Sequence, residues 1–310
     1  MNGIRQLKKS TPRWLAALLL MLPAAGCSDS TSPPTPLEPL SDRWILFDAL
    51  SAASTGLAVY AVLPDGSGLR LVTSGTLAGG WQAFNPLWSR DGNQIAYVTQ
   101  PSDFQTWVMR TDQSETHQIA NSSICAPPLV SMSWSPTGDR IIGDCSTVPH
   151  PSHQYVINVA DGTNYSLDQR WGRLAGSPDW SPIDDRILYV ASGDTHVANL
   201  DGSGDALVLS AATTPKWSPD ASRIAFTRSP STSNAYAVFV ANADGSGAKQ
   251  VSFPPDSSND FSPSWSHDGT QIAFTRQSPK PMYALHVINA DGGGDKKITP
   301  DSLSSGGPSW

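Results

Sequence analysis

A short apolar segment recurs along the chain, and each copy follows a tryptophan and a polar turn. The segments read QIAYV, RIIGD, RILYV, RIAFT and QIAFT, and the turns include Ser-Arg-Asp-Gly at 89–92 and Ser-His-Asp-Gly at 266–269. Short runs rich in β-branched and aromatic residues, bounded by turn residues, are typical of β-strands. Because Gly and Asp accept the backbone angles of a tight hairpin, each copy predicts two strands joined at the turn.

A longer apolar segment and a second turn complete each copy. AYAVFVANA and ALHVINA precede Asp-Gly turns at 244 and 291, and a last segment such as KQVSF or KKIT follows each turn. The longer segments are apolar at nearly every position, which suits a sheet covered on both faces. The repeat therefore predicts four strands, and it shows no helical period.

The tryptophans that mark the copies recur at intervals of 46, 46, 37, 48 and 45 residues. The six markers are Trp88, Trp134, Trp180, Trp217, Trp265 and Trp310. Units of four strands and this length, stacked face to face, are typical of a β-propeller. Each tryptophan is expected to be a wedge between neighbouring blades.

The two ends of the repeat region complement each other. Residues 43–73 match the second, third and fourth strands of a unit, and residues 307–310 (GPSW) match the missing first strand. Joining them makes a sixth blade and leaves no open sheet edge. The prediction is an all-β, six-bladed β-propeller over residues 41–310, with four-stranded antiparallel blades and closure by pairing of the N- and C-terminal strands.

Residues 1–26 have the composition of an export signal. Basic side chains and no acidic one precede the apolar run WLAALLLMLPAAG, which is shorter than the ~20 residues of a spanning helix, and Cys27 follows it. The segment resembles a bacterial lipoprotein signal, which implies lipidation of Cys27. An ordinary secretory signal with an incidental cysteine is the alternative. Residues 27–40, rich in Ser, Thr and Pro, are interpreted as a tether.

The charge of the remaining chain limits its partners. Once residues 1–26 are removed, 16 basic and 27 acidic side chains are left, a net charge of −11. Nucleic-acid binding requires a basic stripe, which this sequence lacks. We expect no nucleic-acid partner.

The repeated motifs resemble those of a known family. Trp-Ser-Pro-Asp-Gly, then Ile-Ala-Phe, then Asn-Ala-Asp-Gly-Ser-Gly is similar to the repeat of TolB-type propellers, and the similarity covers nearly all of residues 41–310. Related repeats occur in the TolB component of the Tol-Pal envelope system, in propellers attached to prolyl-oligopeptidase-like enzymes and in oligogalacturonate lyases. TolB also carries an N-terminal α/β domain with no counterpart in this sequence, so a role in the Tol-Pal system itself is not expected.

Two functions are compatible with these features. The favoured one is a lipid-anchored, monomeric binding or scaffolding module of the bacterial cell envelope, with an envelope protein or a glycan as partner. It would lie on the periplasmic face of a membrane, with the outer membrane favoured. The alternative is a carbohydrate-active or metal-dependent enzyme, a lyase or hydrolase, that uses one propeller face. A serine peptidase is excluded because the sequence has no Gly-x-Ser-x-Gly motif and no room for a hydrolase domain.

Neither a metal nor a cofactor is expected. His150 and His153 lie close together in a proline-rich loop, but two histidines do not supply the three or four ligands of a metal site. Asp201 and Asp205 flank an Asp-Gly turn and raise the question of calcium. Further oxygen ligands and a later glutamate would be needed, so the hairpin-turn interpretation is favoured and calcium is left open.

The predicted topology divides the connections between two rims. The turns after the tryptophans and the Asp-Gly turns form one rim, here called the turn rim. The opposite rim, here called the loop rim, carries the variable segments 74–85, 99–105, 121–128, 146–153, 166–177, 253–262 and 277–282. Aromatic and cationic side chains on loops of a rigid scaffold are common in recognition surfaces. The predicted binding face comprises Trp81, Phe104, His150, His153, Arg170, Trp171, Arg173, Phe253 and Lys280.

The remaining cysteines generate a first prediction. Cys125 and Cys145 flank a predicted hairpin whose turn lies near 135–139, so both reach the same end of the sheet. Exported proteins meet oxidising conditions, and we expect a disulfide. Thiol labelling of the denatured, unreduced domain should find no free cysteine, and Cys125→Ser should expose one. Complete labelling of both thiols in the parent would contradict the bridge.

Overall fold

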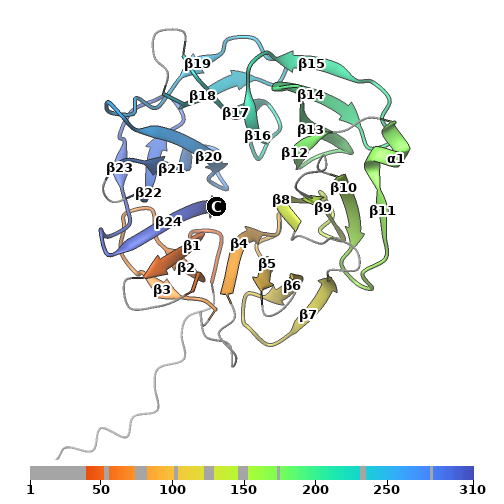
Figure 1. Ribbon diagram of the computed structural model, residues 1–310, viewed down its shortest axis with the longest axis horizontal. Coiled ribbons are helices and arrows are strands. Elements are labelled where there is room, and N and C mark those ends of the chain that lie inside the picture. The colour runs from red at the N-terminus through yellow and green to blue at the C-terminus, as the bar shows by residue number, and fades with distance from the viewer. Residues whose placement is uncertain are drawn as a thin grey trace, which may run out of the picture. The chain divides into compact units, whose positions relative to one another are not determined.

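The computed structural model describes residues 40–51, 56–73, 82–100, 104–121, 129–145, 153–172, 175–230, 235–279 and 282–310. These residues form six four-stranded sheets arranged as blades around a central axis (Figure 1). Every strand pair recorded in the blades is antiparallel. The predicted six-bladed propeller is therefore confirmed.

The two inner strands of each blade carry the tryptophan motif and the apolar segment that follows it. The innermost strands are β24 (Leu303–Ser309), β4 (Gln82–Trp88), β8 (Leu129–Trp134), β12 (Gly176–Trp180), β16 (Thr213–Trp217) and β20 (Asn259–Trp265). The second strands are β1 (Ile45–Ser51), β5 (Gln94–Gln100), β9 (Arg140–Cys145), β13 (Arg186–Ala191), β17 (Arg223–Arg228) and β21 (Gln271–Gln277). We number the blades 1 to 6 in this order.

The outer strands are joined by the Asp-Gly turns or their equivalents. The third strands are β2 (Ala58–Val62), β6 (Gln105–Arg110), β10 (His153–Asn158), β14 (Asp194–Asn199), β18 (Ala237–Asn242) and β22 (Tyr283–Asn289). The fourth strands are β3 (Arg70–Leu71), β7 (Thr116–Ala120), β11 (Asn164–Ser166), β15 (Ala206–Leu209), β19 (Lys249–Gln250) and β23 (Lys296–Lys297). One helix, α1 (Leu167–Trp171), follows β11 and was not predicted; it begins at the Ser166 cap and ends at Gly172, whose φ is 66°.

Blade 1 is assembled from both ends of the described chain. β24 pairs with β1 in the order β24-β1-β2-β3, and Ala49 lies opposite Ser305. β24 also bonds to both neighbouring blades, because the Ser309 hydroxyl accepts from Trp88 N at 2.9 Å and the Ser264 hydroxyl accepts from Trp310 N at 3.0 Å. The predicted closure is confirmed.

The repeated tryptophans fill the seams between blades. Five of them are 0 to 7% exposed, and Trp180 packs on Ile142 and Val156 of the preceding blade. The guanidinium of Arg140, also in that blade, lies 4.7 Å from the Trp180 ring centroid. Removing one such buried ring would cost about 3–5 kcal/mol.

Two buried carboxylates brace the seams near the loop rim. Asp48 Oδ2 accepts from Asn85 N at 2.9 Å, and Asp144 Oδ2 accepts from Ser177 N at 2.5 Å, in each case across a blade boundary. Burial raises the pKa of Asp48 to about 6 and that of Asp144 to about 7. Each carboxyl is therefore mainly neutral in the folded protein only below the pH of its own raised pKa.

No helix in the described ranges is long and apolar enough to cross a membrane.

The closure generates a second prediction. Deleting residues 304–310 removes most of β24 and its bonds to blades 2 and 6, and it leaves the edge of β1 unpaired. The melting temperature should fall sharply and aggregation should increase, as measured by calorimetry and light scattering. Ser304→Ala, which keeps the strand, is the control. A truncated protein as stable as the parent would contradict the role of the closing strand.

The raised pKa of Asp144 generates a third prediction. The protonated Asp144 carboxyl contributes to the free energy of unfolding. This contribution is complete below the pKa of the unfolded state, near 4, and is lost as the pH rises towards 7. Asp144→Asn should not lose stability in this way. The free energy of unfolding of the variant, relative to that of the parent, should therefore rise by on the order of 3 kcal/mol between pH 4 and pH 7. Urea unfolding across this pH range measures the difference, with the exposed Asp256→Asn as control. Parallel pH profiles for parent and Asp144→Asn would refute the argument.

Candidate functional site

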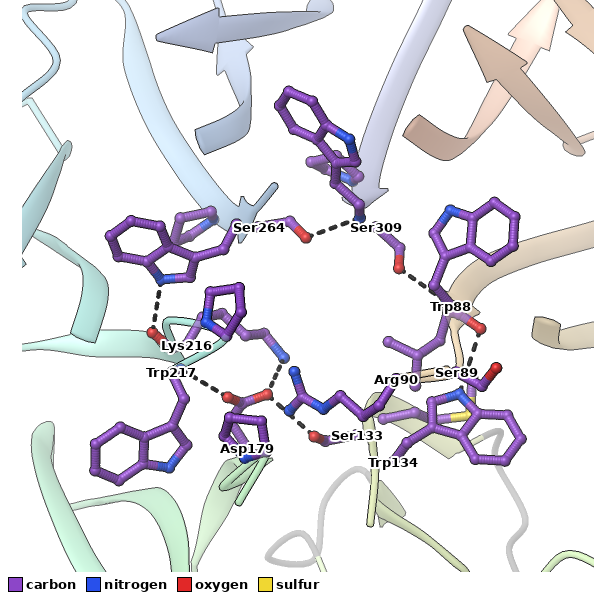
Figure 2. Close-up of a pocket in the computed structure, with 18 of the residues that line it drawn as sticks. Trp88, Ser89, Arg90, Ser133, Trp134, Asp179, Lys216, Trp217, Ser264 and Ser309 are labelled. Atoms are coloured by element: carbon purple, nitrogen blue, oxygen red, sulfur yellow. Dashed lines mark hydrogen bonds and ion pairs between the residues drawn. The ribbon is translucent and has the colours of Figure 1, made fainter. Parts of the chain in front are cut away.

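A cavity of about 470 Å³ lies at the centre of the ring. The innermost strands of all six blades line it, together with residues of the turns after the tryptophans, such as Arg90, Pro136 and His267. The cavity therefore reaches the turn rim. Figure 2 shows Arg90 and residues of the innermost strands around the open centre.

Each innermost strand contains a bulge beside this cavity. The residue three positions before each tryptophan has a φ between 49° and 58°, and the six are Asn85, Ser131, Ser177, Thr214, Ser262 and Gly307. At each of them the pairing register with the second strand shifts. Proline follows in five of the six copies. Bulges of this kind re-aim side chains, and here they set the residues around the channel.

The residue directly before each tryptophan links neighbouring blades. In four of the six seams its side chain accepts a hydrogen bond from the backbone N–H of the next blade's tryptophan: Ser309 to Trp88, Ser133 to Trp180, Asp179 to Trp217 and Ser264 to Trp310. Figure 2 shows three of these links, those made by Ser309, Asp179 and Ser264. The remaining two positions hold Leu87 and Lys216, whose carbonyls accept from the indoles of Trp134 and Trp265.

Asp179 is the buried acid of the cavity and is 3% exposed. Its Oδ2 accepts from Trp217 N at 2.8 Å. Its Oδ1 lies 3.1 Å from the Ser133 hydroxyl and 3.2 Å from Lys216 Nζ. Both oxygens are thus occupied, and Lys216 neutralises the charge.

Arg90 extends into the cavity from the turn after Trp88 (Figure 2). One terminal guanidinium nitrogen donates to the carbonyl of Trp180 at 2.7 Å, two blades away. The Nε atom is buried without a hydrogen-bond partner. Within the described ranges Arg90 forms no ion pair, so its charge is not balanced by a contacting acid.

The predicted binding face is described by the structure only in part, and it stays a prediction. Four of its members lie outside the described residues: Trp81, His150, Arg173 and Lys280. The same holds for Cys27 and Cys125, so lipidation and the disulfide stay predictions, although Cys145 is buried at the end of β9. The others are Phe104, His153, Arg170, Trp171 and Phe253.

Two of the described residues serve in packing. Phe104 is half-buried against the core between blades 2 and 3 and meets Phe84 edge-on at 6.3 Å. Trp171 packs between blades 3 and 4, and its indole donates to Leu200 O at 3.2 Å. There the indole lies against Gly202, the glycine of the next Asp-Gly turn. In other blades the equivalent glycine lies against Ile119, Val208, Val251 or Ile298.

Three others lie nearer the surface. His153 Nδ1 is 3.1 Å from Asp168 Oδ2, and burial raises the pKa of that carboxyl. Arg170 stacks over the ring of Tyr165 at 4.7 Å. Phe253 is 67% exposed on the loop rim and is the most exposed large apolar side chain in the described part of the chain.

The Asp-Gly turns are held by their own side chains. Asp201 Oδ1 accepts from the backbone and the hydroxyl of Ser203 at 2.9 and 2.6 Å, and these hydrogen bonds lower its pKa. Asp205 is bonded instead to Tyr189 and lies beside His196. Across the described segments, no three His, Cys, Asp or Glu side chains are grouped to hold a metal.

The channel residues were missed from sequence, although a signal was present. The position before each tryptophan reads Leu, Ser, Asp, Lys, Ser and Ser within a motif that otherwise repeats. Arg90 likewise stands where three copies have proline. Variation inside a uniform motif indicates positions that differ in role between blades, and here these positions line the channel.

Known structures share this architecture. TolB from Acinetobacter baumannii superposes with a TM-score of 0.71 at 15% identity, over 88% of this chain and 68% of that one. A putative TolB from Agrobacterium tumefaciens gives 0.60 at 15% identity, over 82% and 88%. An oligogalacturonate lyase in complex with manganese gives 0.52 at 14% identity, over 83% and 74%. At these identities the similarity shows the fold alone.

No curated protein shows significant sequence similarity to the chain. A family model does match, that of the TolB beta propeller domain, over residues 65–310. This match covers blades 2 to 6 and the closing strand. The chain therefore belongs to the TolB beta propeller domain family.

Proposed function

We propose that this chain is a lipid-anchored binding and scaffolding propeller of the bacterial cell envelope, and that it binds an envelope protein at the loop rim. The observation that carries the proposal is a group of large apolar side chains exposed there. They are Leu50, Tyr236, Phe253 and Met282, which are 43, 48, 67 and 58% exposed. Exposed apolar groups gathered on one face favour protein association.

These side chains lie on consecutive blades. Leu50 lies next to the last residue of β1 in blade 1, Tyr236 and Phe253 flank the outer strands of blade 5, and Met282 precedes β22 in blade 6. Phe261 and Tyr283 meet edge-on at 6.1 Å in the same region. The strands below are hydrogen-bonded into four-stranded sheets, which limits the ordering cost of binding at the loop rim.

The turn rim has a different character. Its turns are closed by repeated side-chain bonds, such as Ser89 Oγ to Asp91 at 2.6 Å and Ser266 Oγ to Asp268 at 2.7 Å. Ile183 is a large apolar side chain exposed there, at 61%. The loop rim is thus the better candidate for a broad apolar interface.

Family membership supports the envelope location but does not fix its details. Lipidation of Cys27, the outer membrane and a monomeric state belong to this proposal. The likeness to an oligogalacturonate lyase concerns the fold, and no described residue group favours that activity over binding.

The proposal generates a fourth prediction. Phe253→Asp combined with Tyr236→Asp should weaken capture of the envelope partner at least tenfold, because charged side chains would be buried in an apolar interface. Capture from a detergent extract of the producing cells, quantified by crosslinking and mass spectrometry, provides the measurement.

Ile183→Asp is the matched control, since it makes the same kind of change on the opposite rim. It should leave capture unchanged. Equal capture by the parent and the double variant would place the interface elsewhere. Retention of a polysaccharide, with no protein lost in the double variant, would favour a glycan partner instead.

A further inference from the structure

We propose that Arg90 and Lys216 form a binding site for a carboxylate in the central channel, at its turn-rim end. This site lies on the face opposite the proposed protein interface and does not depend on it. The expected ligand presents a carboxylate group and is either a small free carboxylic acid or the C-terminus of a polypeptide.

The first argument is the incomplete bonding of Arg90. A guanidinium has five N–H donors, and among the described residues Arg90 donates one hydrogen bond, to Trp180 O. Its Nε is buried without an acceptor. A partly buried cation with unused donors is a receptor for an anionic acceptor, and arginine matches the geometry of a carboxylate with two parallel hydrogen bonds.

The buried acid of the cavity and the acid of the same turn as Arg90 already accept hydrogen bonds from other groups. Asp179 already accepts from Trp217 N, Ser133 Oγ and Lys216 Nζ. Asp91 is bonded to Ser89 and Asn93 in its own turn.

Asp42, the other carboxylate lining the cavity, is exposed at the turn rim and forms no ion pair with Arg90 within the described ranges. Solvent screens the exposed acids Asp42 and Asp91. Asp179 and Lys216 balance each other, so the positive charge of Arg90 has no contacting acid among the described residues.

The third argument is the space in front of the two cations. Figure 2 shows Arg90 and Lys216 directed toward the same part of the cavity from opposite sides. The cavity holds about 470 Å³, and Pro86, Met132, Pro215 and Pro263 contribute apolar walls. A small acid or one terminal peptide residue fits this volume, with its carboxylate toward the cations and its apolar part against the prolines.

The position of Arg90 in the repeat supports a specific role. Equivalent positions hold Pro136, Pro182 and Pro219, which also line the cavity but carry no charge. A proline would satisfy the turn in blade 2 as well. Arginine at this place adds a cation to the channel, which the turn itself does not require.

The experiment uses the whole propeller with succinate as the small carboxylate, and Ala-Ala-Ala-Ala with a free or an amidated C-terminus as the peptide. Intrinsic tryptophan fluorescence and calorimetry at fixed ionic strength report binding. Saturable binding of succinate or of the free-acid peptide is expected. Arg90→Gln should weaken binding at least tenfold. Arg90→Lys keeps the positive charge but cannot donate two parallel hydrogen bonds to a carboxylate, so it should weaken binding several-fold.

Arg110→Gln is the control, because Arg110 is an exposed arginine of the same blade paired with Asp112 at 3.8 Å. It should bind like the parent. Binding of succinate alone identifies a small acid, and binding of the free-acid but not the amidated peptide identifies a polypeptide terminus.

Three outcomes would overturn the site: no saturable binding, equal binding by Arg90→Gln, or equal binding of free and amidated peptides without succinate binding. None of these outcomes bears on the loop rim, whose variants are tested with the envelope partner.

Discussion

The free edges of the innermost strands are the constraint on which this ring depends. Each such strand pairs with one neighbour only, so the backbone groups on its other side face the channel. Unpaired N–H groups buried near a seam are costly and must find acceptors. Short hydroxyl or carboxylate side chains of the preceding blade supply them, as Ser133 does for Trp180. One residue thus closes a strand edge and joins two blades at once.

The features that were predicted from the sequence are those that repeat from blade to blade. The tryptophan, the turn and the apolar strand recur because every blade must meet the same neighbours, and this regularity gave the six blades and their closure. The bulges were not predicted, because the residue with positive φ differs in type from copy to copy, as Ser177 and Thr214 show. The contact of Trp171 with the next blade was also missed, since only the replacement of a strand end by α1 brings that ring to the seam.

The candidate sites resisted prediction for a different reason. Loop residues such as Phe104 and Phe253 look alike in sequence, but one is half-buried against Phe84 and the other is 67% exposed. Burial of a loop aromatic depends on the path of the loop, which carries no repeat. The channel position before each tryptophan is readable only when the copies are aligned and their differences, rather than their agreement, are examined.

The buried pair formed by Asp179 and Lys216 is more than the bond between blades requires. Serine at the same position joins blades in three other seams, so a hydroxyl is sufficient for the structural bond. Burying a carboxylate and then neutralising it with a lysine costs desolvation that serine avoids. Arg90 adds a further cation in the same cavity. Natural proteins depart from the least costly local choice mainly where function requires it, and all three departures face the same cavity at the turn-rim end of the channel.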